Sequence, residues 1–534
     1  MTIEKFFNNA GPSVADQHYM LDPLKRIDID EVEAMIRQQR YFVLHAPRQT
    51  GKTTALLALM NHLNAKGEYR ALYTNIEGAQ AVRGDMPAGV DAICSALARS
   101  TALYLQDDWM VKWLAGAGRE IAAADRITGM LAGFSLQSPR PIVLLLDEVD
   151  SLVGDTLISL LRQIRAGYAQ RPLAFPQTVI LCGVRDVRDY RIHTGHNEII
   201  TGGSAFNIKS ASLRMGNFSR EETIALWQQH QTATGQCFDP AIWDELWQDT
   251  EGQPWLVNAL GHECTWCDRS ARDRTVPITL DRYKAARERL IYSRTTHLDQ
   301  LTDKLQEPRV KRVVVALLQG ENALEDVPVD DQHYVEDLGL ITSRPQLRIS
   351  NRIYREVIPR ELTWTTQTRI THDQHWYLDG KGRMDMFKLL GAFQQFFREH
   401  SDAWIEGFSY KEAGPQLLMQ AFLQRIVNGG GRISREYALG RKRTDLFLEW
   451  PIDQSQGFHG PIQRVVIELK LWRQGELDPL LSKSLQQTAD YADQVGAEEA
   501  YLIVFDRRDK LSWEERCWQL KRQYGERDIA VWGM

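Results

Sequence analysis

The first half of the chain alternates short apolar runs with segments in which apolar residues recur at helical spacing. The apolar runs are "YFVL" from Tyr41, "IVLLL" from Ile142 and "TVILCGV" from Thr178. Each is typical of a buried strand. Between and after them, stretches such as "TTALLALM" and "SREETIALWQQH" carry apolar residues at helical spacing. Strands that alternate with helices predict an α/β fold.

The second half opens with a polar segment at 363–382 and then repeats the mixture of helices and strands. "MFKLLGAFQQFFREH" and "SLQQTADYADQV" predict helices, and "DLFLEW", "RVVIELKLW" and "AYLIVFD" predict strands. In the middle strand, Val465, Ile467 and Leu469 form an aliphatic face, whereas the other face carries Glu468 and Lys470. Because charges are seldom buried without a partner or a metal, this pair is a candidate functional site.

Composition narrows the class of protein. The 534 residues are 43% hydrophobic and 25% charged with a net charge of -6, which is typical of a globular chain and excludes a uniformly basic nucleic-acid coat. The first residues have no apolar core of signal-peptide length, and no apolar run approaches the roughly 20 residues that span a bilayer. Cys264 and Cys267 lack a second Cys or His pair at zinc-ligand spacing, so we interpret them as helix cysteines. We therefore expect a cytoplasmic protein that does not contact membranes.

The loop after the first strand has the pattern of a phosphate-binding loop, GxxxxGK[ST], with Ala46 in place of the first glycine. Backbone N–H groups of such a loop and the N-terminus of the next helix bind phosphate oxygens. Lys52 is expected to reach the β- and γ-phosphates, and the Thr53 hydroxyl to bind Mg²⁺. The predicted nucleotide-binding residues of the loop are Arg48, Gln49, Thr50, Gly51, Lys52, Thr53 and Thr54.

Two acidic residues follow the strand "IVLLL". Asp147 is expected to hold the magnesium, and Glu148 to polarise the attacking water. The alternative is that Asp147 or Asp150 caps a helix. The third strand ends at Arg185, a candidate γ-phosphate sensor that could equally pair with Asp186 or Asp189.

Together these features resemble the AAA-like P-loop ATPases of the STAND type, found in bacteria and archaea. The segments that carry the resemblance are "FNNAGPSVADQHYMLDPLKR", "HAPRQTGKTT", "LLLDEVDSL", "SAFNIKSASLRMGNFS" and the turn "GQP". It implies a P-loop core at 1–215, a helical lid at 216–295 and a winged-helix-like domain at 296–362. It also implies that Pro254 contacts nucleotide and that the segment around His18 and Tyr19 packs near the base.

The predicted recognition helix of that winged-helix-like domain is acidic. Asp330, Asp331, Glu336 and Asp337 would repel phosphate, so packing against the ATPase core is favoured over entry into a DNA groove.

The order helix, strand with Asp445, strand with Glu468-x-Lys470, helix, strand resembles the PD-(D/E)XK nuclease superfamily, a restriction-endonuclease-like α/β domain at 383–534. In this chemistry Asp445 and Glu468 would bind Mg²⁺, with Mn²⁺ as an alternative, and Lys470 would stabilise developing negative charge. The resemblance therefore implies that the charged face of this strand is an exposed metal pocket. The remaining candidates are Glu412 as a third ligand, Gln487 and Tyr491 as lining residues, and Arg441 and Arg443, in a basic turn with Lys442, as phosphate contacts. The alternatives are a solvated strand face or a nuclease fold that no longer cuts.

These expectations combine into an ATP- and Mg²⁺-dependent ATPase switch joined through 363–382 to a metal-dependent nuclease. The expected partner is nucleic acid, with DNA favoured over RNA, and we expect a homo-oligomer to form on activation. Fusions of this architecture suggest bacterial defence against phage or mobile DNA. Two rival hypotheses stay open: an ATP-dependent scaffold whose nuclease fold only binds nucleic acid or a partner, and a mobile-element protein.

Overall fold

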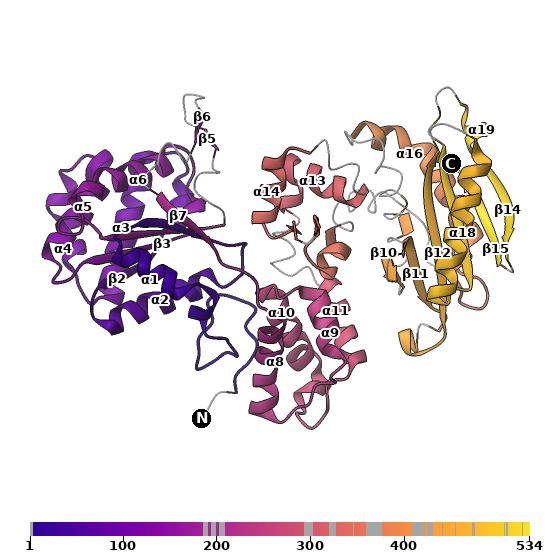
Figure 1. The fold of residues 1–534 in the computed structure, drawn as a ribbon, viewed down its shortest axis with the longest axis horizontal. Helices are drawn as coiled ribbons and strands as arrows, with labels where there is room; N and C mark the ends of the chain where they lie inside the picture. The colour runs from indigo at the N-terminus through magenta and orange to yellow at the C-terminus, as the bar shows by residue number, and fades with distance from the viewer. Residues whose placement is uncertain are drawn as a thin grey trace. The chain divides into compact units, whose positions relative to one another are not determined.

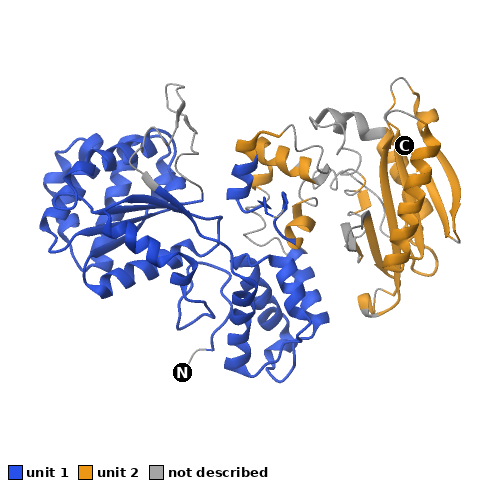
Figure 2. Ribbon diagram, viewed as in Figure 1, with its two compact units in different colours: residues 1–297, 332–351 blue, residues 298–331, 352–534 orange. Residues whose placement is uncertain are grey.

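The chain forms two compact units, residues 1–297 with 332–351 (unit 1) and residues 298–331 with 352–534 (unit 2) (Figure 2). The computed structural model describes residues 4–184, 191–193, 199–201, 209–292, 303–319, 327–344, 346–358, 376–407, 419, 422–423, 431–439, 442–453, 455–472, 476–506, 508, 511–525 and 527–534. Only the backbone is described at 191–193, 199–201, 209–210, 292, 315, 318–319, 399–407, 434–439, 442–445 and 459.

Unit 1 contains a five-stranded sheet in the order β2-β3-β4-β1-β7 (Figure 1). All neighbouring strands in this sheet are parallel. The strands are β1 (Tyr41–His45), β2 (Arg70–Asn75), β3 (Ile142–Asp147), β4 (Thr178–Gly183) and β7 (Lys209–Arg214). Every residue of β3 is buried, which explains why its apolar run is continuous and not alternating. The predicted α/β class is confirmed for this unit.

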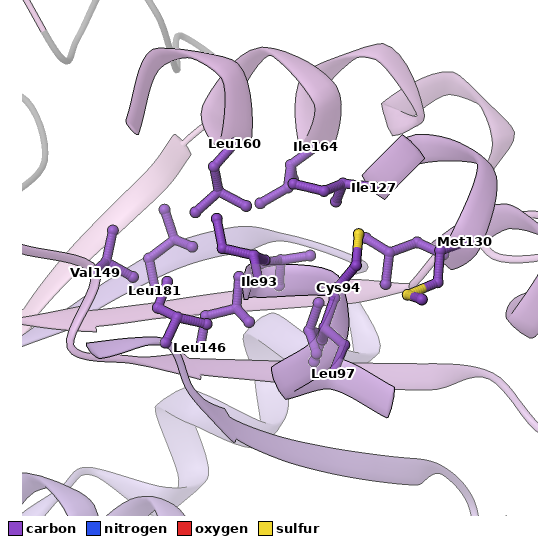
Figure 3. Packing of buried hydrophobic residues seen from close by; sticks show 14 of the residues in the cluster. Ile93, Cys94, Leu97, Ile127, Met130, Leu146, Val149, Leu160, Ile164 and Leu181 are labelled. Atoms are coloured by element: carbon purple, nitrogen blue, oxygen red, sulfur yellow. The ribbon is translucent and has the colours of Figure 1, made fainter. Parts of the chain in front are cut away.

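Helices cover both faces of this sheet (Figure 1). On one face α1 (Ile29–Arg37) and α2 (Lys52–Lys66) pack against the strands through residues such as Ile36, Leu56 and Leu63. On the other face lie α3 (Met86–Tyr104), α4 (Trp109–Ala115), α5 (Ala123–Gln137) and α6 (Gly154–Ala166). Figure 3 shows this second core, in which Leu97, Ile127, Leu160 and Leu181 meet from α3, α5, α6 and β4.

A helical segment follows the sheet, as the resemblance implied. It consists of α8 (Arg220–Thr234), α9 (Ile242–Thr250), α10 (Pro254–His262), a π-helical turn (Glu263–Cys267) and α11 (Leu280–Tyr292). Helix α8 begins at a capping box in which Ser219 and Glu222 each bind the other's backbone N–H. Gly252, at φ +70°, precedes α10, and a Cβ atom there would lie 1.9 Å from the carbonyl oxygen of Phe218. Only glycine therefore fits at the start of the predicted "GQP" turn.

The next part of the chain, where the winged-helix-like domain is expected, contains two helices and two short strands in the described residues. These are α13 (Pro308–Gln319), α14 (Val329–Asp337), β8 (Ile341–Thr342) and β9 (Arg348–Ile349). Strands β8 and β9 pair with each other in antiparallel orientation and belong to unit 1.

Unit 2 contains a six-stranded mixed sheet in the order β10-β11-β12-β13-β15-β14. Strands β12, β13 and β15 are mutually parallel, and the other pairs are antiparallel. The strands are β10 (Arg432–Leu439), β11 (Lys442–Pro451), β12 (Ile462–Trp472), β13 (Glu499–Asp506), β14 (Trp518–Tyr524) and β15 (Arg527–Gly533). Three of them, β10, β14 and β15, are additions to the predicted strands.

Helices pack on both faces of this sheet in the described part of the chain. Helix α16 (Met386–Gly407) covers the face that includes Val465, Ile467 and Leu469. Helix α18 (Leu477–Val495) covers the opposite face, where Val466 and Trp472 lie on β12. The two predicted faces of β12 are therefore both core faces, and the charged pair lies on the α18 side.

Candidate functional site

The lysine that follows the loop between β1 and α2 forms hydrogen bonds to backbone carbonyl groups of that loop. Gly51, in a left-handed conformation at φ +87°, begins α2. The Lys52 ammonium then donates to the carbonyl oxygens of Ala46 and Pro47, both at 3.1 Å. Its side chain is 95% buried by residue area and, among the described residues, forms no ion pair with a carboxylate. The ammonium is therefore held by backbone dipoles and lies near the Glu148 carboxylate, and its charge can bind an anionic ligand in the cavity that it lines.

Asp147, at the end of β3, is joined directly to the loop helix. The Thr53 hydroxyl donates to Asp147 Oδ2 at 2.7 Å, and the Tyr73 hydroxyl donates to the same oxygen at 3.0 Å. The other oxygen, Oδ1, accepts from the backbone N–H of Glu148 at 3.0 Å. Since Asp147 has no exposed surface, these three bonds hold a buried carboxylate beside a hydroxyl. A carboxylate and a hydroxyl are the protein ligands that a nucleotide-bound Mg²⁺ uses.

Glu148 has an unusual backbone and an unusual environment. It adopts φ +60°, a left-handed conformation that is strained for a residue other than glycine. Burial raises the pKa of its carboxyl group, and the nearby Lys52 charge partly opposes that rise. A raised pKa makes Glu148 a stronger base, as a water-activating residue requires.

The alternative role of these acids as helix caps is not supported by the geometry. Residues Val149–Ser151 form a short 3-10 helix whose N-cap is Glu148, with no side-chain capping bond. Asp150 instead accepts from the backbone N–H of Val184 at 3.2 Å, and α6 also begins without a side-chain cap. Asp150 therefore fixes the end of β4.

A cavity of about 260 Å³ opens directly above this loop. Its lining residues from the loop and from the end of β3 are Gln49, Gly51, Lys52, Thr53, Thr54 and Glu148, and those from the N-terminal and helical segments include Tyr19, Met20, Leu226, Pro254, Trp255 and Asn258. The N-terminal segment closes one side through Asn8 to Ser13 and is tied down at two points. Trp255 Nε1 donates to the Asn9 carbonyl at 2.9 Å, and the Ser13 N–H donates to Thr54 Oγ1 at 3.1 Å.

Most of the predicted nucleotide-binding residues therefore surround one cavity. Pro254 and Tyr19 line it as the resemblance implied, whereas His18 is turned to the backbone N–H of Val14 at 2.8 Å. Arg48 and Thr50 belong to the loop without lining the cavity, and Asp147 lies behind Thr53. The candidate sensor Arg185 lies outside the described residues.

Arg26 is a cation of this cavity that the sequence analysis missed. Its guanidinium donates to the carbonyl oxygens of Thr50 and Gly216 and lies 4.7 Å from the centre of the Phe218 ring. Burial lowers its pKa to about 10, so it stays charged at neutral pH. Arg26 is the last residue of the segment "FNNAGPSVADQHYMLDPLKR", but no pattern in the sequence singles it out. Its contacts in the structure identify it as part of the site.

The segment 332–351 contacts both parts of this site. Arg348 forms a two-pronged ion pair with Glu251 at 2.6 and 2.7 Å, directly before the "GQP" turn. Arg214, at the end of β7, donates to the Glu336 carbonyl at 2.9 Å. A Cβ atom at Gly339 would lie 2.8 Å from Pro47 in the phosphate loop. These contacts agree with the favoured interpretation, in which this segment packs against the ATPase core.

The charged pair of β12 in unit 2 is more buried than expected. Glu468 is 1% exposed, and its Oε1 accepts from the Lys470 ammonium at 2.6 Å. The interpretation of an entirely exposed charged face is therefore wrong, because α18 covers Glu468 and leaves only Lys470 partly open to solvent. On α18, Gln487 Nε2 donates to the Tyr491 hydroxyl at 2.8 Å.

The other predicted nuclease residues are only partly described. Glu412 and Arg441 lie outside the described residues, and only the backbone of Asp445 is described. Lys442 and Arg443 belong to β11 and not to a turn. The register Leu446↔Ile467 places the preceding residue of β11, Asp445, beside Glu468 on the neighbouring strand. Among the described side chains, no group of three His, Cys, Asp or Glu residues could hold a metal ion, and Cys264 and Cys267 belong to no such group. No helix in the described part of the chain is long and apolar enough to cross a bilayer.

Comparison with known proteins finds similarity in structure only. No model of a known protein family matches the chain, and no curated protein sequence matches it. A Walker-type ATPase of Pyrococcus abyssi is 12% identical, with a TM-score of 0.47 over 66% of this chain and 99% of that one. The ORC2 protein of Aeropyrum pernix, solved as ADPNP–ADP complexes, is 13% identical, with a TM-score of 0.40 over 63% of this chain and 94% of that one. The RuvB branch migration motor of Thermotoga maritima is 12% identical, with a TM-score of 0.33 over 64% of this chain and 98% of that one. Sequence identities and TM-scores this low do not assign a function to the chain.

Proposed function

We propose that unit 1 binds and hydrolyses ATP together with Mg²⁺. The observation that carries this proposal is the bond from Thr53 to the buried Asp147 at the base of the cavity that Lys52 and Glu148 line. Mg²⁺ in nucleotide sites is held by one or two protein groups and by phosphates, so this hydroxyl and carboxylate fit it without a dedicated cage. The metal neutralises phosphate charge. Lys52 binds the β- and γ-phosphates, and Glu148 takes a proton from the attacking water.

The test of this part is ATP turnover by the full chain and by Lys52→Ala. We expect Lys52→Ala to lose ATP binding or hydrolysis, because Lys52 is the cation of the loop that lines the cavity, whereas Arg48 does not line it. Lys66→Ala is the matched control, since Lys66 lies at the far end of the same helix and pairs with Glu33 on the surface. Normal turnover in Lys52→Ala would rule out the nucleotide site.

We further propose that unit 2 cleaves a phosphodiester bond with a divalent metal ion. Support comes from the register of the adjacent strands β11 and β12, in which Asp445 lies beside Glu468, and from the partly exposed Lys470 that donates to Glu468. Glu468 and Asp445 would hold the metal, which lowers the pKa of a bound water. Lys470 would stabilise the negative charge that develops on the phosphate.

Plasmid nicking tests this second part. We expect cleavage in Mg²⁺ or Mn²⁺, none in EDTA, and a loss on the order of 10²–10³ in Lys470→Gln, which keeps a hydrogen-bond donor beside buried Glu468. Lys521→Gln, on the exposed strand β14, is the control. Cutting in EDTA, or full activity in Lys470→Gln, would remove the nuclease from the proposal.

The biological role we propose is defence against phage or mobile DNA, with DNA as the substrate and a homo-oligomer as the active form. A nucleic-acid-binding scaffold is the second candidate, favoured by the burial of Glu468, because a buried ion pair is also compatible with a structural role. Binding of DNA without metal-dependent cutting would select the scaffold.

A further inference from the structure

A second acid–cation pair lies at the end of the strand next to β12. Asp506, the last residue of β13, is buried, and its carboxylate accepts from Arg508 Nε at 3.0 Å and from Arg508 Nη2 at 2.7 Å. The backbone N–H of Arg508 donates to the same carboxylate at 3.1 Å. The guanidinium lies 3.4 Å from the centre of the Trp472 ring, so one face of it is stacked.

This pair repeats the arrangement of Glu468 and Lys470. In both cases a buried acid is followed two residues later by a cation that is partly open to solvent, with side chains 26% exposed for Lys470 and 36% exposed for Arg508. The parallel register pairs Trp472 with Asp506, directly after the pairing of Lys470 with Val504. Lys470 and Trp472 point to the same face of β12, about 6.6 Å apart along the strand.

The arrangement places the two cations on the solvent side of the two carboxylates, with Glu515 near enough to Arg508 to act on its charge. Both carboxylates are covered, whereas the two cations above them reach solvent at the same end of the sheet. Asp506 occupies only Nε and Nη2 of the guanidinium, and within the described residues Nη1 has no hydrogen bond in the structure. An arginine that is stacked and held by a carboxylate is fixed in place, so it loses little freedom when its remaining donors bind an anion.

We infer that Arg508, stacked on Trp472, is a phosphate-binding subsite for the nucleic-acid backbone, one phosphate away from the phosphate that Lys470 contacts. The inference rests on the proposed nuclease function of unit 2. A purely structural ion pair would need neither the exposed guanidinium edge nor the alignment with Lys470. Backbone contacts of this kind position nucleic acid without reading its sequence.

The experiment measures binding of a fluorescent DNA duplex and of an RNA duplex to the full chain in EDTA, at several salt concentrations. The variant is the double substitution Asp506→Asn with Arg508→Gln, which keeps a hydrogen bond inside the sheet and removes both charges. We expect the slope of log K against log salt to fall by about 0.9 for the lost phosphate contact. In the cleavage assay KM should rise while kcat stays near the wild-type value.

Arg527→Gln is the control, because Arg527 also forms a partly exposed ion pair, with Asp493, but begins β15 at the opposite end of the sheet. A slope for the double variant equal to that of Arg527→Gln, on both DNA and RNA, would overturn the inference. If the double variant does not fold, Arg508→Gln alone replaces it, and a wild-type salt slope in that variant overturns the inference in the same way. If the wild-type chain shows no cleavage, the nuclease proposal is ruled out. The salt dependence of nucleic-acid binding then still tests the phosphate-binding subsite.

Discussion

The bond between Thr53 and Asp147 allows a quantitative test of the nucleotide site. Thr53→Val replaces the hydroxyl by a methyl group of similar shape, so it removes the 2.7 Å bond without leaving a cavity. Threonine and valine also have similar helix propensity. The substitution therefore isolates one hydrogen bond to a buried carboxylate.

The expected cost follows from the contacts of Asp147. A hydrogen bond to a charged group contributes about 1.5–3 kcal/mol. Asp147 keeps the bonds from Tyr73 and from the backbone of Glu148, both at 3.0 Å, so we expect a loss near the lower half of that range, about 2 kcal/mol. The measurement is urea denaturation of the nucleotide-free full chain, following the transition that ATP shifts.

The same variant tests the magnesium role. A ligand present at 100 times its Kd stabilises the folded state by about 2.7 kcal/mol. In the wild type Mg²⁺ should increase the stabilisation by ATP, whereas in Thr53→Val this increase should vanish. Thr53→Ser keeps the hydroxyl and should behave as the wild type. If Thr53→Val unfolds like the wild type and keeps the Mg²⁺ effect, the hydroxyl neither holds Asp147 nor binds the metal.

Three further predictions concern the surroundings of this bond. Gly252→Ala should destabilise unit 1 by clearly more than the ~1 kcal/mol expected of Gly235→Ala, measured by thermal unfolding, since both glycines have left-handed φ but only at 252 would the Cβ meet a backbone oxygen, at 1.9 Å; equal losses would contradict the steric argument. Because burial raises the pKa of Glu148, the single-turnover rate of ATP hydrolysis should fall on acidification already above the ordinary glutamate range, where the base becomes protonated; a rate that stays flat until the ordinary range is reached would argue against Glu148 as the base. Trp255→Phe should weaken ATP binding by a factor corresponding to about 1 kcal/mol, measured by calorimetry, because the N-terminal segment loses the bond to Asn9; unchanged affinity would mean that this segment does not shape the cavity.

The phosphate loop and the two acids after β3 could be predicted because their signals are local. A buried strand, a glycine, a lysine and a hydroxyl follow one another within a few residues, and the loop backbone does the binding. For that reason the change of the first glycine to Ala46 leaves the shape intact: Ala46 is fully buried and still bonds through its backbone to Gly183 and Lys52.

The rest of the site depends on contacts between residues far apart in the chain. Tyr73 and Asp147 are hydrogen-bonded although 74 residues separate them in sequence, and Trp255 and Asn9 although 246 residues do. Hydrophobic periodicity gives no information on such pairs. In unit 2 the alternation of β12 was predicted, but the sequence could not show that α18 covers Glu468. Strand β14 was missed because its apolar–polar alternation covers only Trp518 to Lys521 and is followed by polar residues.

The most direct test of the central claim, that unit 1 hydrolyses ATP with Glu148 as the base, is the identity of the nucleotide that Glu148→Gln retains. After incubation with Mg²⁺ and radiolabelled ATP and rapid removal of free nucleotide, the wild-type chain should hold ADP. Glu148→Gln should hold intact ATP, bound with similar affinity and hydrolysed on the order of 10²–10⁴ times more slowly. If Glu148→Gln converts ATP to ADP at the wild-type rate, the assignment of the site is contradicted.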